Sequence, residues 1–284
     1  MALIDLVEYF NDRFEREHHA NYRPLIIEND RVSGIFGQLK VSSIFSPLRQ
    51  TEKPTSVNGH AVKIKVAACE SSHLHAYEME NLALNSNETH DLFESIINFD
   101  RLARTVHMLN YLPLAQSKNV LFLEVDPRHI LGIKKDHGAY FESVIEQCGL
   151  TTHNTVIVLA VTSSYVKYNE ALIRGLSNYR KRGYQIALRF DHLISDKHAF
   201  ELIEKLTPDY VSLSARQIEH ADGHNALKKL QALKHAISLT QGKGILRQID
   251  RKKTELLARQ SGFDFVEGSY YDNLSTTHQS IIKS

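Results

Sequence analysis

Two apolar runs in the middle of the chain constrain its fold more than any other feature. Residues Val120–Val125 read VLFLEV and residues Thr155–Val161 read TVIVLAV, so that apolar side chains occupy nearly every position. A strand with one solvated face alternates between apolar and polar residues, whereas a strand buried on both faces is apolar almost throughout. The two runs therefore predict strands of a parallel sheet whose faces are both covered.

Strands alternate with helices along most of the chain. The apolar pattern predicts strands at Val41–Phe45, Ala61–Ala67, Asn119–Val125, Thr155–Val161, Gln185–Phe190, Tyr210–Leu213, Gly244–Leu246 and Phe263–Glu267. Helical spacing predicts helices at Glu88–Leu109, Gly138–Gln147, Tyr168–Arg182, Lys197–Leu206, Ala226–Thr240 and Arg251–Ser261. Such an alternation fits an α/β fold of the TIM-like (β/α)₈ barrel type better than an open doubly wound sheet.

The first two predicted strands have no helix between them. Their connection is a polar loop that contains Pro54 and the pair Asn58-Gly59, and it is too short for a crossover helix. Only antiparallel strands can be joined by so short a connection. One strand of the barrel is therefore expected to run antiparallel to its neighbours.

An extension precedes the predicted barrel. Leu3, Leu6, Val7, Phe10 and Phe14 have helical spacing and predict an amphipathic helix that packs on its own domain, with a membrane or a partner protein as the alternatives. The polar stretch Asn21–Leu39 is interpreted as an irregular connector. The predicted organisation is a helix and connector over residues 1–39, a barrel over 40–274 and a C-terminal tail over 275–284.

Composition narrows the possible partners and the compartment. The chain has 34 basic and 33 acidic residues and a formal net charge of +1, so no overall field favours nucleic acid or an anionic membrane. No apolar run approaches the ~20 residues of a membrane span, and the start MALIDLVEYF lacks the basic and small-residue features of a signal peptide. Cys69 and Cys148 have no paired spacing, which favours a reduced, cytoplasmic protein.

The C-terminal third resembles a known family. Residues Ile249–Gly268 read IDRKKTELLARQSGFDFVEG and are similar, without a gap, to the closing segment VETEEQLxLLxxLGxDxxQG of EAL-domain cyclic di-GMP phosphodiesterases. Seven further blocks, upstream in the chain, occur in the family's order. They are Ile44–Gln50 (similar to YQPIV), Asn58–Val66 (VGxEALxR), Phe99–Leu112 (the helix before the third strand), Val120–Ile130 (LSVNVSPxxL), Val156–Ser164 (VLEITES), Gly183–Asp191 (GxxIALDDFG) and Leu206–Ser214 (LPVDYLKID). The resemblance covers roughly residues 40–274 and implies an EAL-type barrel with an antiparallel first strand.

The functional positions depart from the family's pattern. The signature Glu-Ala-Leu corresponds to Ala61-Val62-Lys63, so the first metal ligand that the resemblance implies is absent. The other ligands and the acid–base groups correspond to Glu124, Ala160, Arg189, Phe190, Ser212, Ser214 and Arg247, and only the last acid is kept, as Asp250. Asp191 replaces one of the paired aspartates if the loop shifts by one residue.

These departures predict a loss of the chemistry that the resemblance implies. The family hydrolyses cyclic di-GMP with a water activated by two divalent cations, and such cations need carboxylate and water oxygens. At most Glu124, Asp191 and Asp250 remain here, while Arg189 and Arg247 bring positive charge that cannot be removed by deprotonation. We therefore expect no catalytic residues, no metal and no other cofactor.

The same residues form the candidate site. Lys65 corresponds to a phosphate-contacting arginine of the family. Its companions are Glu124, Arg189, Asp191, Arg247 and Asp250. In one interpretation the two arginines form salt bridges with the three acids and fill a disused site; in the other they hold the phosphates of a nucleotide or another anion.

The predicted function is a catalytically inactive EAL-like regulatory module of bacterial signalling that acts by binding another protein. The first alternative is a receptor that binds cyclic di-GMP or a related anion without cutting it. The second is a divergent phosphodiesterase that uses Glu124, Asp191 and Asp250 around one metal. A homodimer is the expected assembly, because two-fold pairing is the commonest state of soluble oligomers.

Overall fold

The computed structural model describes residues 2–18, 22–68, 89–115, 119–133, 136–191, 197–217 and 223–272. They fall into two compact units. Unit 1 consists of Met1–Phe45, Val62–Ser117 and Val125–Thr152, and unit 2 consists of Ser46–Ala61, Lys118–Glu124 and His153–Ser284. The predicted tail over residues 275–284 and Cys69 lie outside the described residues.

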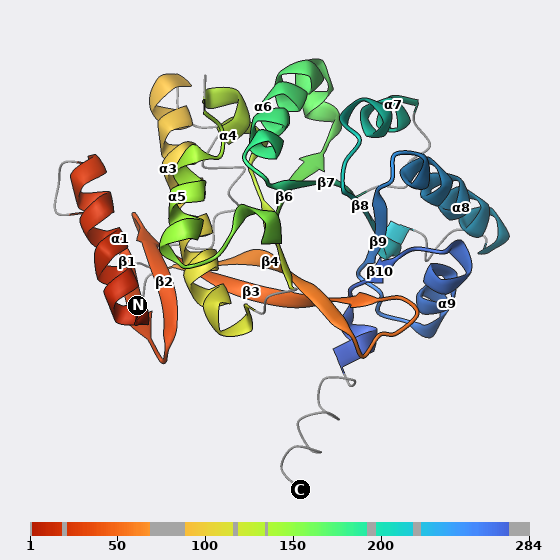
Figure 1. The fold of residues 1–284 in the computed structure, drawn as a ribbon, viewed down its shortest axis with the longest axis horizontal. Coiled ribbons are helices and arrows are strands. Elements are labelled where there is room, and N and C mark those ends of the chain that lie inside the picture. The colour runs from red at the N-terminus through yellow and green to blue at the C-terminus, as the bar shows by residue number, and fades with distance from the viewer. Residues whose placement is uncertain are drawn as a thin grey trace, which may run out of the picture. The chain divides into compact units, whose positions relative to one another are not determined.

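The strands form one sheet that closes on itself (Figure 1). They are β1 (Leu25–Glu28), β2 (Arg31–Phe36), β3 (Leu39–Gln50), β4 (Val57–Ala68), β5 (Val120–Glu124), β6 (Thr155–Val161), β7 (Gln185–Phe190), β8 (Tyr210–Ser214), β9 (Lys243–Arg247) and β10 (Phe265–Val266). Their order is β1-β2-β3-β10-β9-β8-β7-β6-β5-β4, and a further pairing of β3 with β4 closes the strands β3 to β10 into a barrel. Strand β3 runs antiparallel to β10, whereas β4 to β10 pair in parallel. The predicted α/β barrel with one antiparallel strand is confirmed.

Unit 2 is built around strands that are buried on both faces, as the apolar runs predict. The burial pattern of β6 shows five successive buried residues, and all five residues of β8 are buried. In the core between the strands, the ring of Tyr210 lies 4.9 Å from that of Phe122 and 6.2 Å from that of Phe265. The outer side carries α6 (Asn169–Lys181), α7 (Lys197–Leu206), α8 (Gly223–Leu239) and α9 (Lys252–Ser261) (Figure 1).

Unit 1 contains α1 (Leu3–His18), α3 (Thr89–Tyr111), α4 (Pro127–Gly132) and α5 (Ala139–Gln147), together with β1, β2 and parts of β3 and β4. Helix α1 buries Leu6, Val7, Phe10 and Phe14 and contacts β1 and α3, so the predicted amphipathic helix packs within its own unit. The buried Asn11 fixes this contact. Its carboxamide accepts from the Leu25 N–H and donates to the Leu25 carbonyl, both at 2.9 Å.

The predicted irregular connector over Asn21–Leu39 is wrong. This stretch contains β1, β2 and the start of β3, joined by two tight turns. The first turn places Asn29 and Asp30 at φ 50° and 58°, and the second places Gly37 at φ 58°. Asn, Asp and Gly are the residues that tolerate positive φ in two-residue hairpin turns, so the signal was present in the sequence but was outweighed by the polar composition.

The predicted helices agree with the structure to within a few residues at each end, and Lys197–Leu206 agrees at both ends. The last strand is shorter than predicted, since only Phe265 and Val266 pair. Helix α4 is additional to the predicted helices. Asp126 caps it by accepting from the Arg128 N–H at 2.8 Å, and Pro127 occupies its first turn. None of the described helices is both long and apolar enough to span a bilayer.

Candidate functional site

Five of the six predicted site residues belong to unit 2 and lie at or just after the carboxyl ends of its strands. Glu124 is the last residue of β5, Arg189 is the penultimate residue of β7, and Arg247 is the last residue of β9. Asp191 and Asp250 follow β7 and β9 in the chain. Because β5 to β9 pair in parallel, their carboxyl ends lie along one rim of the sheet.

Ion pairs join four of these residues. Arg189 binds Glu124 through Nη1, and its Nη2 lies 3.5 Å from Oδ2 of Asp191. Arg247 Nη2 donates to Oδ1 of Asp191 at 2.7 Å. Two guanidinium groups therefore alternate with two carboxylates, as in the first of the two predicted interpretations.

The four side chains differ in exposure. The carboxylate side chains of Glu124 and Asp191 are 43% and 50% exposed, whereas those of Arg189 and Arg247 are 22% and 11% exposed. The Nε atoms of both arginines are buried and have no hydrogen-bond partner among the described residues. A buried donor without a partner costs about 1–3 kcal/mol, so each guanidinium group leaves part of its hydrogen-bonding capacity unused in this arrangement.

Asp250 does not join this cluster, contrary to the prediction. In the described part of the chain its Oδ1 accepts from the Ser269 hydroxyl at 2.7 Å, and its Oδ2 lies 3.7 Å from Nη2 of Arg216. The cause is the backbone after β9. Gly268 packs so closely on Ile249 that a Cβ there would lie 2.2 Å from the Ile249 carbonyl oxygen, and this packing brings Ser269 beside Asp250.

Lys65 belongs to unit 1. It lies near the end of β4, where the Ser42 hydroxyl donates to its backbone carbonyl at 3.3 Å. Its side chain is exposed and lines a cavity of that unit.

The residues present do not fit a pair of divalent cations. Two of the remaining carboxylates are each bound to arginine, and the third pairs with Ser269 and Arg216. Within the described residues no three His, Cys, Asp or Glu side chains converge as metal ligands. Ala61, at the signature position, packs against the apolar core of unit 2 instead.

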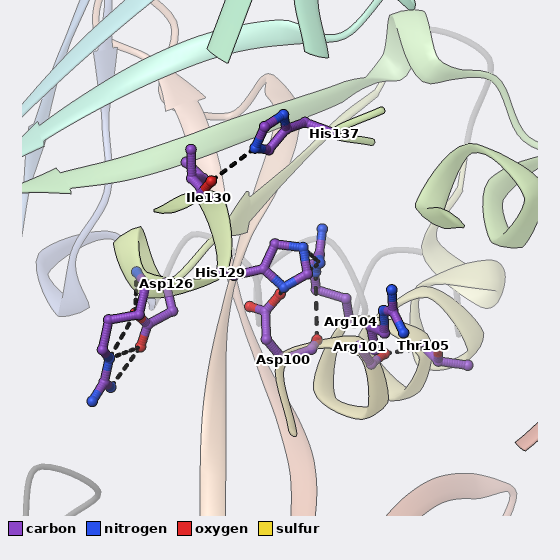
Figure 2. Close-up of polar contacts among 9 residues, drawn as sticks. Asp100, Arg101, Arg104, Thr105, Asp126, His129, Ile130 and His137 are labelled. Carbon is purple, nitrogen blue, oxygen red and sulfur yellow. Dashed lines mark hydrogen bonds and ion pairs between the residues drawn. The ribbon is translucent and has the colours of Figure 1, made fainter. Parts of the chain in front are cut away.

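A second charged cluster, in unit 1, was missed by the sequence reasoning (Figure 2). It is buried and consists of Asp100, Arg104 and His129. Oδ2 of Asp100 lies 2.5 Å from Arg104 Nη2 and 2.9 Å from His129 Nδ1, and Arg104 Nη2 lies 3.1 Å from His129 Nε2. The cluster joins α3 to α4. Its signal in the sequence was an Asp and an Arg four residues apart within an apolar helical pattern.

The protonation states in this cluster follow from burial and charge. Burial by itself would raise the pKa of Asp100, but the charge of Arg104 and the contact with His129 outweigh it and lower that pKa. Burial lowers the pKa of His129, and it lowers the pKa of His107 to about 4. Asp100 is therefore charged and both histidines are neutral at neutral pH, so His129 donates from Nδ1 and accepts at Nε2.

The loop after α4 is fixed by a further buried histidine. Nε2 of His137 donates to the carbonyl of Ile130 at 2.7 Å (Figure 2). The ion pair of Asp126 with Arg128 holds the start of the helix. These contacts stabilise the segment that follows β5. Because Asp100, Arg104 and His129 are buried between α3 and α4, we interpret the cluster as structural.

No protein-family model and no curated protein matches the sequence. Solved structures do. The chain is similar to Klebsiella pneumoniae BlrP1 in its calcium/cyclic di-GMP complex, with 13% identity and a TM-score of 0.63 over 81% of this chain and 54% of that chain. It is similar to the Bacillus subtilis YkuI protein, with an EAL domain, in complex with cyclic di-GMP and calcium, with 17% identity and a TM-score of 0.60 over 86% of this chain and 61% of that chain. It is also similar to a standalone EAL protein from Vibrio cholerae O395 in its cyclic di-GMP-bound form, with 12% identity and a TM-score of 0.61 over 81% of this chain and 90% of that chain.

The chain has the fold of an EAL domain. It spans little more than half of the BlrP1 and YkuI chains but most of the standalone protein, so the similarity is to the barrel. A further BlrP1 structure, with FMN and cyclic di-GMP and no metal ions, is similar with a TM-score of 0.55. At these identities the likeness establishes the fold and no more.

Proposed function

We propose that this EAL-type barrel has no phosphodiesterase activity and acts as a regulatory module by binding another protein. The observation that carries the proposal is the pairing of Glu124 and Asp191 with Arg189 and Arg247. These are the carboxylates that would have to hold a metal, and each already faces a permanent positive charge. A like charge near a bound cation costs a few kcal/mol even when screened, which lowers metal affinity by orders of magnitude.

The test is hydrolysis by the purified chain. With cyclic di-GMP and either Mg²⁺ or Mn²⁺ we expect no linear dinucleotide, and we expect Mn²⁺ to leave the Tm unchanged. The double variant Arg189→Asn, Arg247→Gln removes both guanidinium charges and leaves a neutral, hydrogen-bonding amide at each position. We expect it to gain a Mn²⁺-dependent rise in Tm. Turnover by the unaltered chain would refute the proposal.

One observation favours the second candidate, a receptor that binds cyclic di-GMP or a related anion without hydrolysis. Arg189 and Arg247 each bury an Nε donor that has no partner among the described residues. Arginine binds phosphate through paired donors, so an anion that displaced the carboxylates and turned the guanidinium groups towards it would pair with Nε and Nη together. A fold neighbour that holds cyclic di-GMP with no metal ions supports this possibility. Calorimetry with cyclic di-GMP in a chelator tests it: heat that disappears in Arg247→Met would favour the receptor.

A further inference from the structure

Unit 1 contains a cavity of about 1570 Å³ that is separate from the arginine–carboxylate cluster of unit 2. Its walls come from the β1–β2 hairpin, from Ser42–Phe45 of β3, from the end of β4 and from the last turn of α3 with the following residues Leu112–Leu114. Pockets for small molecules usually measure about 300–1,000 Å³. The size of this one suits a longer ligand.

The cavity lies where β2 and β3 separate. Their ladder pairs Phe36 with Leu39 and continues to Gly34 opposite Val41. In the same register the next hydrogen-bonded pair would be Val32 with Ser43. Instead the carboxamide of Asn110, on α3, accepts from the Val32 N–H at 2.8 Å and donates to the Val32 carbonyl at 2.7 Å. Asn110 therefore takes the place of β3 beside β2.

This separation leaves an edge of β3 directed at the cavity. The two-residue turn between β2 and β3 makes Phe36 and Leu39 a hydrogen-bonded pair. In an antiparallel ladder every second residue directs its backbone N–H and C=O to the same neighbour, so those of Ser43 and Phe45 point to the edge of β3 that Leu39 uses to pair with β2. Both residues line the cavity.

The edge is held in place from α3. The Ser43 hydroxyl lies 2.7 Å from Nδ1 of the buried His107, and Asn110 Nδ2 donates to the same hydroxyl at 3.3 Å. Because burial keeps His107 neutral at neutral pH, Nδ1 can accept from Ser43. A fixed strand edge reduces the ordering that a ligand must bring about.

The lining combines apolar side chains with a small positive excess. Ile44 and Leu114 are 48% and 36% exposed, and both line the cavity. Of the charged lining residues, Lys40 and Glu28 form an ion pair with each other. The other charged residues of the described lining are Arg31, Lys65 and Asp30, so the described part of the wall carries one net positive charge. A carboxylate therefore complements the wall better than an ammonium group.

We propose that this cavity binds an extended peptide segment of a partner protein, which pairs with the β3 edge at Ser43 and Phe45, packs an apolar side chain on Ile44 and places a carboxylate near Lys65. Strand addition to an exposed edge gains affinity from main-chain hydrogen bonds and specificity from alternate side chains. The inference rests on the proposed protein-binding function and names the surface and the kind of partner.

The test uses selected peptides as the probe. A library of random dodecapeptides is selected on the full chain, and enriched peptides are synthesised with a fluorescent label. We expect alternating apolar residues with at least one Asp or Glu. Polarisation titrations compare the unaltered chain with Ile44→Glu and with the matched control Ile64→Glu, since Ile64 is 40% exposed in the same unit but does not line the cavity. We expect Ile44→Glu to weaken binding about tenfold or more and Ile64→Glu to change it less than about twofold.

Two further measurements identify the binding mode. N-methylation of alternate peptide nitrogens should abolish binding in one register and spare it in the other, and bound peptide should slow hydrogen exchange at the Ser43 and Phe45 amides. Any one of four results would overturn the proposal. They are equal binding to Ile44→Glu, binding that N-methylation does not affect, unchanged hydrogen exchange at these amides, and a selection that enriches no peptide. The hydrolysis assay is independent of these readouts. A chain that cleaves cyclic di-GMP yet binds peptides here would refute the proposed function and keep the site.

Discussion

The arginine–carboxylate cluster of unit 2 and the Asp100–Arg104–His129 cluster of unit 1 both pair arginine with carboxylates but lie in different surroundings. In unit 1 the side chains of Asp100 and Arg104 are 9% and 3% exposed, whereas in unit 2 those of Glu124 and Asp191 are 43% and 50% exposed. A buried ion pair cannot be broken without leaving a charge away from water, but an exposed one is exchanged for water at little cost. The first cluster is therefore costly to break, whereas the second can exchange its ion pairs for water at little cost.

The largest expected effect follows from removing one charge of the buried cluster. Asp100→Asn leaves Arg104 charged and without its carboxylate in a dry environment, and we expect the free energy of unfolding to fall by about 3–5 kcal/mol. Urea unfolding of the full chain measures it.

The matched control is Asp12→Asn in the same unit, since Asp12 forms an ion pair with Arg23 while 60% exposed. We expect it to cost less than about 1 kcal/mol. The double variant Asp100→Leu, Arg104→Met should be more stable than Asp100→Asn, because no unpaired charge remains. Similar losses for Asp100→Asn and Asp12→Asn would remove the distinction between the clusters.

A pH dependence of stability should come from His107, one of the buried histidines of unit 1. The pKa of His107 is lowered from 6.5 to about 4 by burial, so between these pH values the unfolded chain binds more protons than the folded one. The free energy of unfolding should therefore fall as the pH is lowered from 6.5 towards 4, by about 3 kcal/mol from this residue. His107→Gln should flatten this slope.

His235→Gln is the control, because His235 is exposed on α8 in unit 2. Urea midpoints at several pH values compare the two variants. If His107→Gln kept the full slope, protonation of His107 would not be its source.

The smallest effect is expected at the exposed cluster. Glu124→Gln removes one ion pair of Arg189 but leaves Asp191 beside it, and we expect a loss of less than about 1 kcal/mol. The difference should shrink further in 1 M salt, where the Debye length is about 3 Å. A loss comparable to that of Asp100→Asn, unaffected by salt, would show that the two clusters do not differ as proposed.

Much of the fold could be predicted from the sequence, because the signal is repeated along the chain. The runs at Val120–Val125 and Thr155–Val161 predict strands buried on both faces, and the structure confirms them. The β1–β2 hairpin was missed since its turn depends on two residues, Asn29 and Asp30, within a polar stretch. A signal that rests on two residues is easily outweighed by composition.

The site was predictable only in part. Glu124, Arg189, Asp191 and Arg247 were predicted from the family resemblance, and the parallel pairing of the strands places them along one rim. The separation of Asp250 from them depends on the close packing of Gly268 on Ile249, which no spacing reveals. The cavity beside Ser43 depends on Asn110, which lies far away in the sequence.

The sequence by itself determined the alternation of strands and helices, the antiparallel first strand and the presence of arginine where a metal site would need acids. These follow from local periodicity and residue type, which the chain carries at every position. Only the tertiary structure decided which charges pair, which histidines are buried, and where β2 and β3 separate. Those outcomes depend on contacts between distant residues and on the water that packing excludes from them, and neither is encoded in any single segment.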